Sequence, residues 1–122
     1  MQVFRTDETI RAALATIAEL EERYKNISIQ DKGKRFNLDL LEAVELGFLI
    51  ELAKVMSVGA LHRKESRGGH YREDFPKRDD VNFMKHSMVY LDPESEFEGV
   101  KGLRFETKPV VYTRYEPKER KY

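Results

Sequence analysis

The sequence contains no cysteine and has no excess of either charge. Among its 122 residues, 22 Lys and Arg balance 22 Asp and Glu. Without cysteine the chain forms no disulfide, offers no thiolate to a metal and has no thiol nucleophile. Nucleic-acid-binding domains usually carry excess positive charge, so the balanced charge argues against a nucleic-acid partner.

Long apolar runs are also missing. The N-terminus lacks the basic stretch followed by an apolar run that marks a signal peptide. The most apolar stretch, residues 43–61, contains Glu45, Glu51 and Lys54, which is unfavourable for a transmembrane span. The sequence therefore predicts a soluble chain, and its length fits a single domain over residues 1–122.

Two segments have the apolar spacing of helices. Apolar residues at spacings of three and four predict an amphipathic helix over residues 7–24, which starts near Thr6. A second helix is predicted over residues 38–67, with Asn37 as its N-cap. The second helix is apolar over most of its circumference, so the first helix can cover only one of its sides.

The remaining residues predict shorter elements. Asp79 and Asp80 can cap a short helical turn, and residues 86–91 and 103–107 alternate like strands around a loop at 92–102. The fold class is therefore mainly α. We expect a helical hairpin at 6–67, a motif loop with a helical turn at 68–84, and a β-hairpin with an extended tail at 85–122.

The junction at residues 63–76 reads R-K-E-S-R-G-G-H-Y-R-E-D-F-P. Gly68 and Gly69 are expected to end the second helix, because glycine readily adopts the positive φ of a helix C-terminus. The cations that precede the glycines would complement the unpaired carbonyls of that helix end. A junction so rich in Arg, His and Asp needs partners, within the chain or across an interface.

Three kinds of chemistry are conceivable at this junction, and each has a simpler alternative. A metal or acid–base cluster of His70, Asp74 and Asp79 matches no zinc signature, and scattered histidines are usually structural. Ser66 lacks the G-x-S-x-G context of a hydrolase nucleophile. A phosphate loop normally precedes a helix, whereas Gly68 follows one.

The charged side chains also allow two interpretations. The arginines of the junction could clamp a carboxylate substrate, but structural ion pairs are favoured because such networks are common at interfaces. The tail at 114–122 mixes aromatic and basic residues, and its interleaved Glu116 and Glu119 favour a docked tail over an RNA contact.

The junction and the R-D-D-V-N-F-M-K-H-S-M that follows it strongly resemble the C-terminal region of succinate dehydrogenase and fumarate reductase flavoprotein subunits. The family pattern is E-S-R-G-x-H, R-x-D-x-P, R-D-D-x-N-aromatic and K-H-S/T, with F-N-x-x-L-L-E-A-x-E-L upstream and a closing R-x-Y. The details look most like actinobacterial succinate dehydrogenases. We expect a domain interface formed by Arg63, Glu65, Ser66, Arg67, Gly68, His70, Arg72, Asp74, Arg78, Asp79, Asp80, Arg120 and Tyr122.

The resemblance implies a spectrin-repeat-like three-helix bundle that packs on the flavin-binding domain of the same subunit. The parent subunit oxidises succinate to fumarate with FAD and passes electrons to an iron–sulfur subunit and a quinone, as a peripheral subunit on the cytoplasmic side of the plasma membrane. For these residues the resemblance implies no catalytic, cofactor-binding or metal-binding role and no activity alone. The alternatives are a fumarate reductase or L-aspartate oxidase relative, or a stand-alone helical interaction module.

The resemblance also concerns what covers the second helix. The family bundle has a helix before V-F-R-T-D, the element at which this chain starts. We therefore expect the first helix of the bundle to be missing here. The chain should then self-associate or rearrange to bury Leu49, Val55 and their neighbours.

Overall fold

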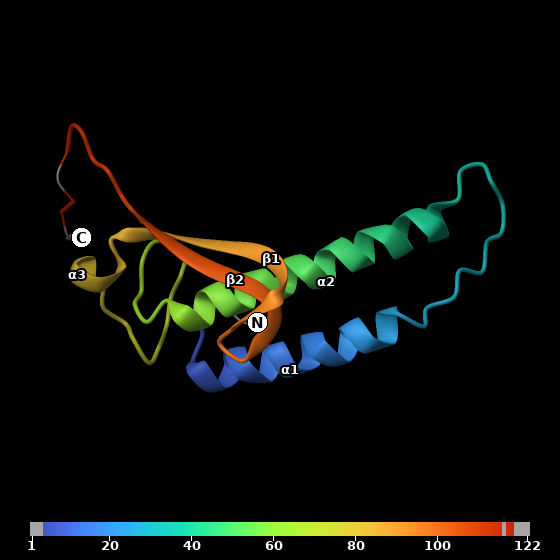
Figure 1. The fold of residues 1–122 in the computed structure, drawn as a ribbon, viewed down its shortest axis with the longest axis horizontal. Helices are drawn as coiled ribbons and strands as arrows, with labels where there is room; N and C mark the ends of the chain where they lie inside the picture. Colours follow the sequence, from blue (N-terminus) through green and yellow to red (C-terminus); the bar gives the residue numbers. More distant parts are fainter. Residues whose placement is uncertain (1–3, 116, 119–122) are drawn as a thin grey trace.

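The computed structural model of the chain describes residues 4–115, 117 and 118. Its elements are α1 (Asp7–Tyr24), α2 (Leu38–His62), α3 (Asp80–Phe83), β1 (Lys85–Phe97) and β2 (Val100–Pro109). In Figure 1, α1 and α2 run side by side in opposite directions, and the hairpin of β1 and β2 lies along the C-terminal half of α2. The expected mainly helical fold with two long antiparallel helices and a small β-hairpin is confirmed.

The start of α1 is fixed by a reciprocal cap. The Thr9 backbone N–H donates to the Thr6 hydroxyl at 3.2 Å, and the Thr6 N–H donates to Thr9 Oγ1 at 2.9 Å. Both N–H groups would otherwise lack a partner inside the helix. The predicted helix over residues 7–24 has the observed bounds.

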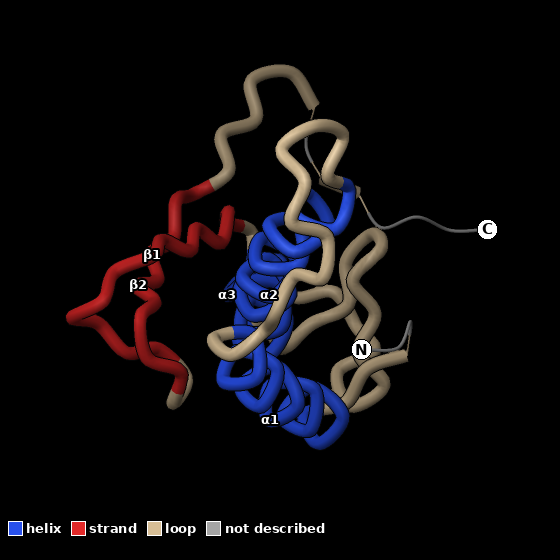
Figure 2. The backbone as a smooth tube through the Cα atoms, turned by 90° about the vertical axis from the view of Figure 1, so that its right-hand side faces the viewer, coloured by secondary structure: helices blue, strands red, loops and turns tan. Residues whose placement is uncertain are grey.

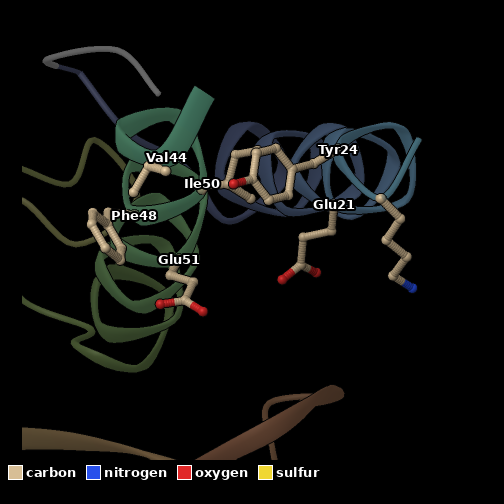
Figure 3. Close-up of a pocket in the computed structure, with 8 residues that line it drawn as sticks. Glu21, Tyr24, Val44, Phe48, Ile50 and Glu51 are labelled. Atoms are coloured by element: carbon tan, nitrogen blue, oxygen red, sulfur yellow. The ribbon is translucent and has the colours of Figure 1, made fainter. Parts of the chain in front are cut away.

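The antiparallel pair of helices is held by a small core and by one close approach. Tyr24 reaches from α1 to α2, where its hydroxyl donates to the Ala43 carbonyl at 2.9 Å, and Figure 3 shows Tyr24 and Ile50 among the side chains that line one pocket. A Cβ added at Gly47 would come within 2.5 Å of the Tyr24 hydroxyl, so this approach requires glycine. The buried apolar residues of the described chain are Ile10, Ile17, Ile50, Val58, Leu61 and Leu103.

The end of α2 differs from the prediction. The helix starts after Asn37, as expected, but it ends at His62 and not near Arg67, and Arg63 is already extended with ψ 96°. Gly68 does adopt a positive φ of 59°, but in a tight turn where Arg67 and His70 exchange backbone hydrogen bonds of 2.8 and 3.0 Å. The helix stops early because Glu65 pairs with Arg63 and Arg67, and residues two apart do not face each other on a helix.

The β-hairpin is longer than predicted. Both strands continue through the expected loop at 92–102 and meet at a turn made by Glu98 and Gly99, whose φ angles are 53° and 78°. Two positive φ angles define the turn type that matches the twist of paired strands. The strand pairing is irregular between Leu91 and Glu96, where Pro93 has no N–H to donate.

The hairpin contacts the end of α2 through an aromatic cluster. The His62 ring lies 4.2 Å from the Phe105 centroid and 5.2 Å from the Phe97 centroid, and the two Phe rings stack at 4.3 Å. Leu103 is fully buried. Figure 2 shows the strands on one side of the helices, so the hairpin covers only part of α2.

Much of α2 stays uncovered in this chain. Leu49 and Phe48 are each 61% exposed, and Leu52 is 57% exposed. Among the described residues, no helix is long and apolar enough to cross a membrane. Large apolar side chains exposed together on one helix are typical of a contact surface. The expected need for further cover of α2 therefore agrees with the structure, whereas the nature of that cover stays a prediction.

We predict that the isolated chain self-associates through this surface. Sedimentation velocity should show a mass above 14.4 kDa at micromolar concentration. Leu49→Lys should shift the distribution toward monomer, because a charge in an apolar contact is costly to desolvate. Val81→Lys, at a 93% exposed position on α3, is the matched control and should have no effect. A monomeric wild-type chain that remains folded would contradict the prediction.

Candidate functional site

The junction after α2 is organised around the carboxylate of Glu65, which has no exposed surface. This carboxylate accepts hydrogen bonds from Arg63 Nη1 at 2.6 Å, Arg67 Nε at 2.8 Å and Arg67 Nη2 at 3.0 Å. The backbone N–H of Asp79 adds a fourth, at 2.8 Å. The carboxylate is therefore fully surrounded by donors, which is the condition for burying an ionised group.

Arg63 extends this network to the hairpin. Its Nη1 also donates to the Phe83 carbonyl at 2.9 Å, and its Nη2 donates to the Lys85 carbonyl at 2.6 Å and to Ser87 Oγ at 3.0 Å. One guanidinium thus connects the end of α2 with α3 and the start of β1.

Arg67 extends the network in the opposite direction, to the R-D-D segment. Its Nη2 lies 2.6 Å from Asp80 Oδ1, and Asp80 Oδ2 accepts from Arg78 Nη2 at 2.8 Å. Asp79 caps α3, since its Oδ1 accepts from the N–H groups of Val81 and Asn82 at 3.0 and 2.9 Å. The predicted pairing of these arginines with Asp and Glu is therefore present within the chain.

A second network is built on Arg72, which is also fully buried. Its Nε and Nη2 donate to the two oxygens of Asp74 at 2.7 and 2.5 Å. Its Nη1 donates to the carbonyls of Ala60 and Leu61 at 3.1 Å each. Asp74 in turn accepts from the N–H of Asp7 at 2.9 Å, so the start of α1 is tied to the end of α2.

Ser66 holds the loop together. Its hydroxyl oxygen accepts from the Arg72 N–H at 2.9 Å and lies 2.8 Å from the Phe75 carbonyl, to which it donates. A hydroxyl that is used in this way, at the junction after a helix, has the arrangement of a structural residue. The interpretation of Ser66 as a nucleophile therefore finds no support in the geometry.

His70 is neutral and connects the side chain of Arg5 with the backbone of Arg63. Arg5 Nη1 donates to His70 Nδ1 at 3.3 Å, which leaves Nε2–H to donate to the Arg63 carbonyl at 3.1 Å. Burial lowers the pKa of His70, and the charges of Arg5 and Arg72 lower it further. Among the described residues no group of three or more His, Asp and Glu side chains could hold a metal ion, so His70, Asp74 and Asp79 are not brought together as a metal cluster.

The carboxylates of the two networks are stabilised in their ionised forms. Burial raises the pKa of Glu65, but hydrogen bonds from Arg67, Asp79 and Arg63 together outweigh it, so the pKa lies below its usual value. The hydrogen bond from Arg72 lowers the pKa of Asp74 to about 2.

The structure thus brings together most of the residues predicted from the sequence. Gly68 supplies the turn between Arg67 and His70, while Arg120 and Tyr122 lie outside the described residues. The roles of Arg5 and Ser87 did not follow from the sequence: Arg5 lies far from the junction along the chain, and the K-H-S/T pattern that includes Ser87 does not give its partner Arg63. Only contacts in three dimensions place them there.

Comparisons with known proteins agree with this fold. Residues 1–122 match the model of the family described as "Fumarate reductase flavoprotein C-term". The chain is 43% identical over 122 residues to the 8-methylmenaquinol:fumarate reductase flavoprotein subunit of Wolinella succinogenes, covering 100% of this chain and 19% of that protein. It is 40% identical over 111 residues to the succinate dehydrogenase flavoprotein subunit of Rickettsia felis, covering 91% of this chain and 18% of that protein.

A solved structure of Escherichia coli quinol fumarate reductase is similar to the chain with a TM-score of 0.84 and 38% identity, covering 96% of this chain and 19% of that one. The chain therefore belongs to the family of fumarate reductase and succinate dehydrogenase flavoprotein C-terminal regions. It spans about a fifth of the length of these relatives. The predicted likeness to actinobacterial succinate dehydrogenases in particular stays a prediction.

We predict that Glu65→Gln lowers the free energy of unfolding by about 3 kcal/mol, because it leaves two largely buried guanidinium groups without their counter-charge. Urea unfolding would measure this change. Glu22→Gln is the control, since the Glu22 side chain is 72% exposed and its ion pair with Lys25 should contribute less than about 1 kcal/mol. Equal small effects of the two substitutions would contradict the central role of Glu65.

The low pKa of Asp74 predicts an acid dependence of stability. The pKa is about 2 in the folded chain and near 3.8 in an ordinary aspartate, so the folded state favours the ionised form. The resulting stabilisation is fully present above pH 4 and is lost as the pH falls toward 2. The stability difference between the wild type and Asp74→Asn should therefore shrink over this range. A constant difference from pH 5 to pH 2 would refute the assignment.

Proposed function

We propose that the chain serves as the C-terminal helical domain of a succinate dehydrogenase flavoprotein subunit, with the corresponding domain of a fumarate reductase or an L-aspartate oxidase relative as the alternative. The match of the whole chain, residues 1–122, to the flavoprotein C-terminal family carries this proposal. The complete subunit would interconvert succinate and fumarate, with electrons passing between FAD, an iron–sulfur subunit and a quinone.

The domain itself would be structural and not catalytic. An FAD site of the dinucleotide type needs a glycine-rich turn between a strand and a helix. In the described part of the chain the only two strands are β1 and β2, which pair antiparallel, and no helix follows either of them. The residues present do not fit FAD, so FAD would be held by the flavin-binding domain.

The Glu65 and Arg72 networks would shape the face that packs on the flavin-binding domain. Their ion pairs hold the loop at 63–80 against the ends of α1, α2 and β1. A loop fixed in this way presents a preorganised surface, which reduces the entropy lost on docking. In the parent complex the whole subunit would be peripheral, on the cytoplasmic side of the plasma membrane.

A stand-alone helical interaction module is the second candidate, and the exposed apolar face of α2 is the observation that favours it. The open reading frame that encodes this chain distinguishes the two candidate functions. A flavin-binding domain upstream in the same reading frame supports the first, whereas a frame confined to these 122 residues supports the second.

We predict that Arg67→Ala in the full-length subunit lowers flavin retention and assembly more than it changes substrate affinity. Arg67 connects Glu65 with Asp80, so its loss should loosen the docking face without altering a substrate contact. Flavin content after gel filtration and the dissociation constant for succinate would be measured on the same preparation. Arg35→Ala, in the exposed loop before α2, should leave both unchanged. An assembled variant with normal flavin content that no longer binds succinate would show the proposed role to be wrong.

A further inference from the structure

Arg5 differs from the other arginines of the junction because it lacks a counter-charge. Arg63, Arg67, Arg72 and Arg78 each lie within 2.5 to 2.8 Å of an Asp or Glu oxygen. In the part of the chain that the structure describes, Arg5 has no such ion pair. Among the described residues, its Nη1 donates a hydrogen bond to the ring of His70, which is neutral, and its Nε is buried without a hydrogen-bond partner. A half-buried guanidinium without an anion is costly, so an anion from elsewhere is the expected complement.

Arg5 lies at a cleft of about 350 Å³ that carries no acidic residue. We call it the Arg5 cleft, and its wall includes Arg5, Met56, Gly59, Arg63, His70 and Ser87. The guanidinium of Arg63 is already saturated by Glu65 and the start of β1. The cleft therefore offers one uncompensated cation beside a hydroxyl and a short apolar wall.

Gly59 supplies an independent indication that something approaches this cleft closely. It stands inside α2, where glycine is destabilising by about 1 kcal/mol relative to alanine. Its φ is not positive, and a Cβ added there would meet no atom within 4 Å, so neither the backbone nor internal packing requires glycine. The contrast with Gly47, where Tyr24 fills the space, is direct. The open surface over Gly59 would suit an external chain segment that packs against bare helix backbone.

We propose that the Arg5 cleft receives an Asp or Glu side chain from the remainder of the flavoprotein polypeptide, which pairs with Arg5 and packs over Gly59. This inference rests on the proposed function. The occupant is a protein segment because part of the wall is apolar, which suits the stem of a side chain and its neighbours. Relatives of the chain also carry about four fifths of their length outside the matched region.

The test uses the full-length subunit with Arg5→Lys, which keeps the positive charge and introduces an amine. A carbodiimide couples this amine to a carboxylate in direct contact, and peptide mass spectrometry locates the product. The expected result is an amide from position 5 to one Asp or Glu outside residues 1–122. Adding Gly59→Gln should lower its yield about tenfold, since the longer side chain fills the cleft while improving helix propensity. Adding Glu42→Gln, at an exposed position on α2, is the control and should not change the yield.

The native lysines separate failure of this inference from failure of the proposed function. Cross-links from Lys64 or Lys85 to the remainder of the subunit, with none from position 5, would overturn the Arg5 cleft alone. Absence of any cross-link between residues 1–122 and the remainder would overturn the proposed function as well. Carbodiimide-driven acetylation of the amine at position 5 by added sodium acetate, in preference to the native lysines and without a cross-link to the remainder, would assign the cleft to a free carboxylate and overturn the inference.

Discussion

The buried carboxylate of Glu65 is the constraint on which the junction depends. An ionised group without exposed surface is tolerated only when donors surround it, and here they come from Arg63, Arg67 and the backbone of Asp79. Residues two apart share a side of an extended chain and not of a helix. The pairing of residues 63, 65 and 67 therefore requires that α2 end before it. The return of the chain to Asp79 then sets where α3 and β1 begin.

Arg72 transmits this arrangement to the two long helices. Its guanidinium occupies the C-terminus of α2, where the carbonyls of Ala60 and Leu61 carry the negative end of the helix dipole. The same group fixes Asp74, which accepts a hydrogen bond from the first turn of α1. One buried cation thus satisfies the end of one helix and, through its partner, the start of the other. The relative position of α1 and α2 is set by polar contacts at this end and by Tyr24 at the other.

The features predictable from the sequence are those determined by near neighbours. The capped starts of α1 and α2 follow from Thr6 and Asn37, because capping acts over three residues. The end of α2 was mispredicted because Gly68 resembles a helix terminator. The helix ends earlier because Glu65 pairs with Arg63 and Arg67, and burial of that carboxylate also depends on the N–H of Asp79, fourteen positions away. The hairpin was underestimated because Pro93 and Gly99 resemble loop residues. In the structure Pro93 lies where the pairing is interrupted and Gly99 lies in the turn, and the strands pair again between the two. The arginines could be assigned to ion pairs as a group, but their individual partners depend on tertiary contacts.

The internal pairing also indicates where contacts with other molecules should be sought. Residues of the Glu65 and Arg72 networks already satisfy one another, so their charges have little left to offer a partner. In the proposed docking face they would determine its shape and not its binding energy. The groups that the described chain leaves unsatisfied are of two kinds: the Arg5 guanidinium beside Gly59, and the exposed apolar side chains of α2. An interface core is typically apolar and contains few charges, most of them paired. Most of the binding energy with a partner should therefore come from the apolar side chains of α2. The isolated charge of Arg5 should determine how the partner is positioned on this chain.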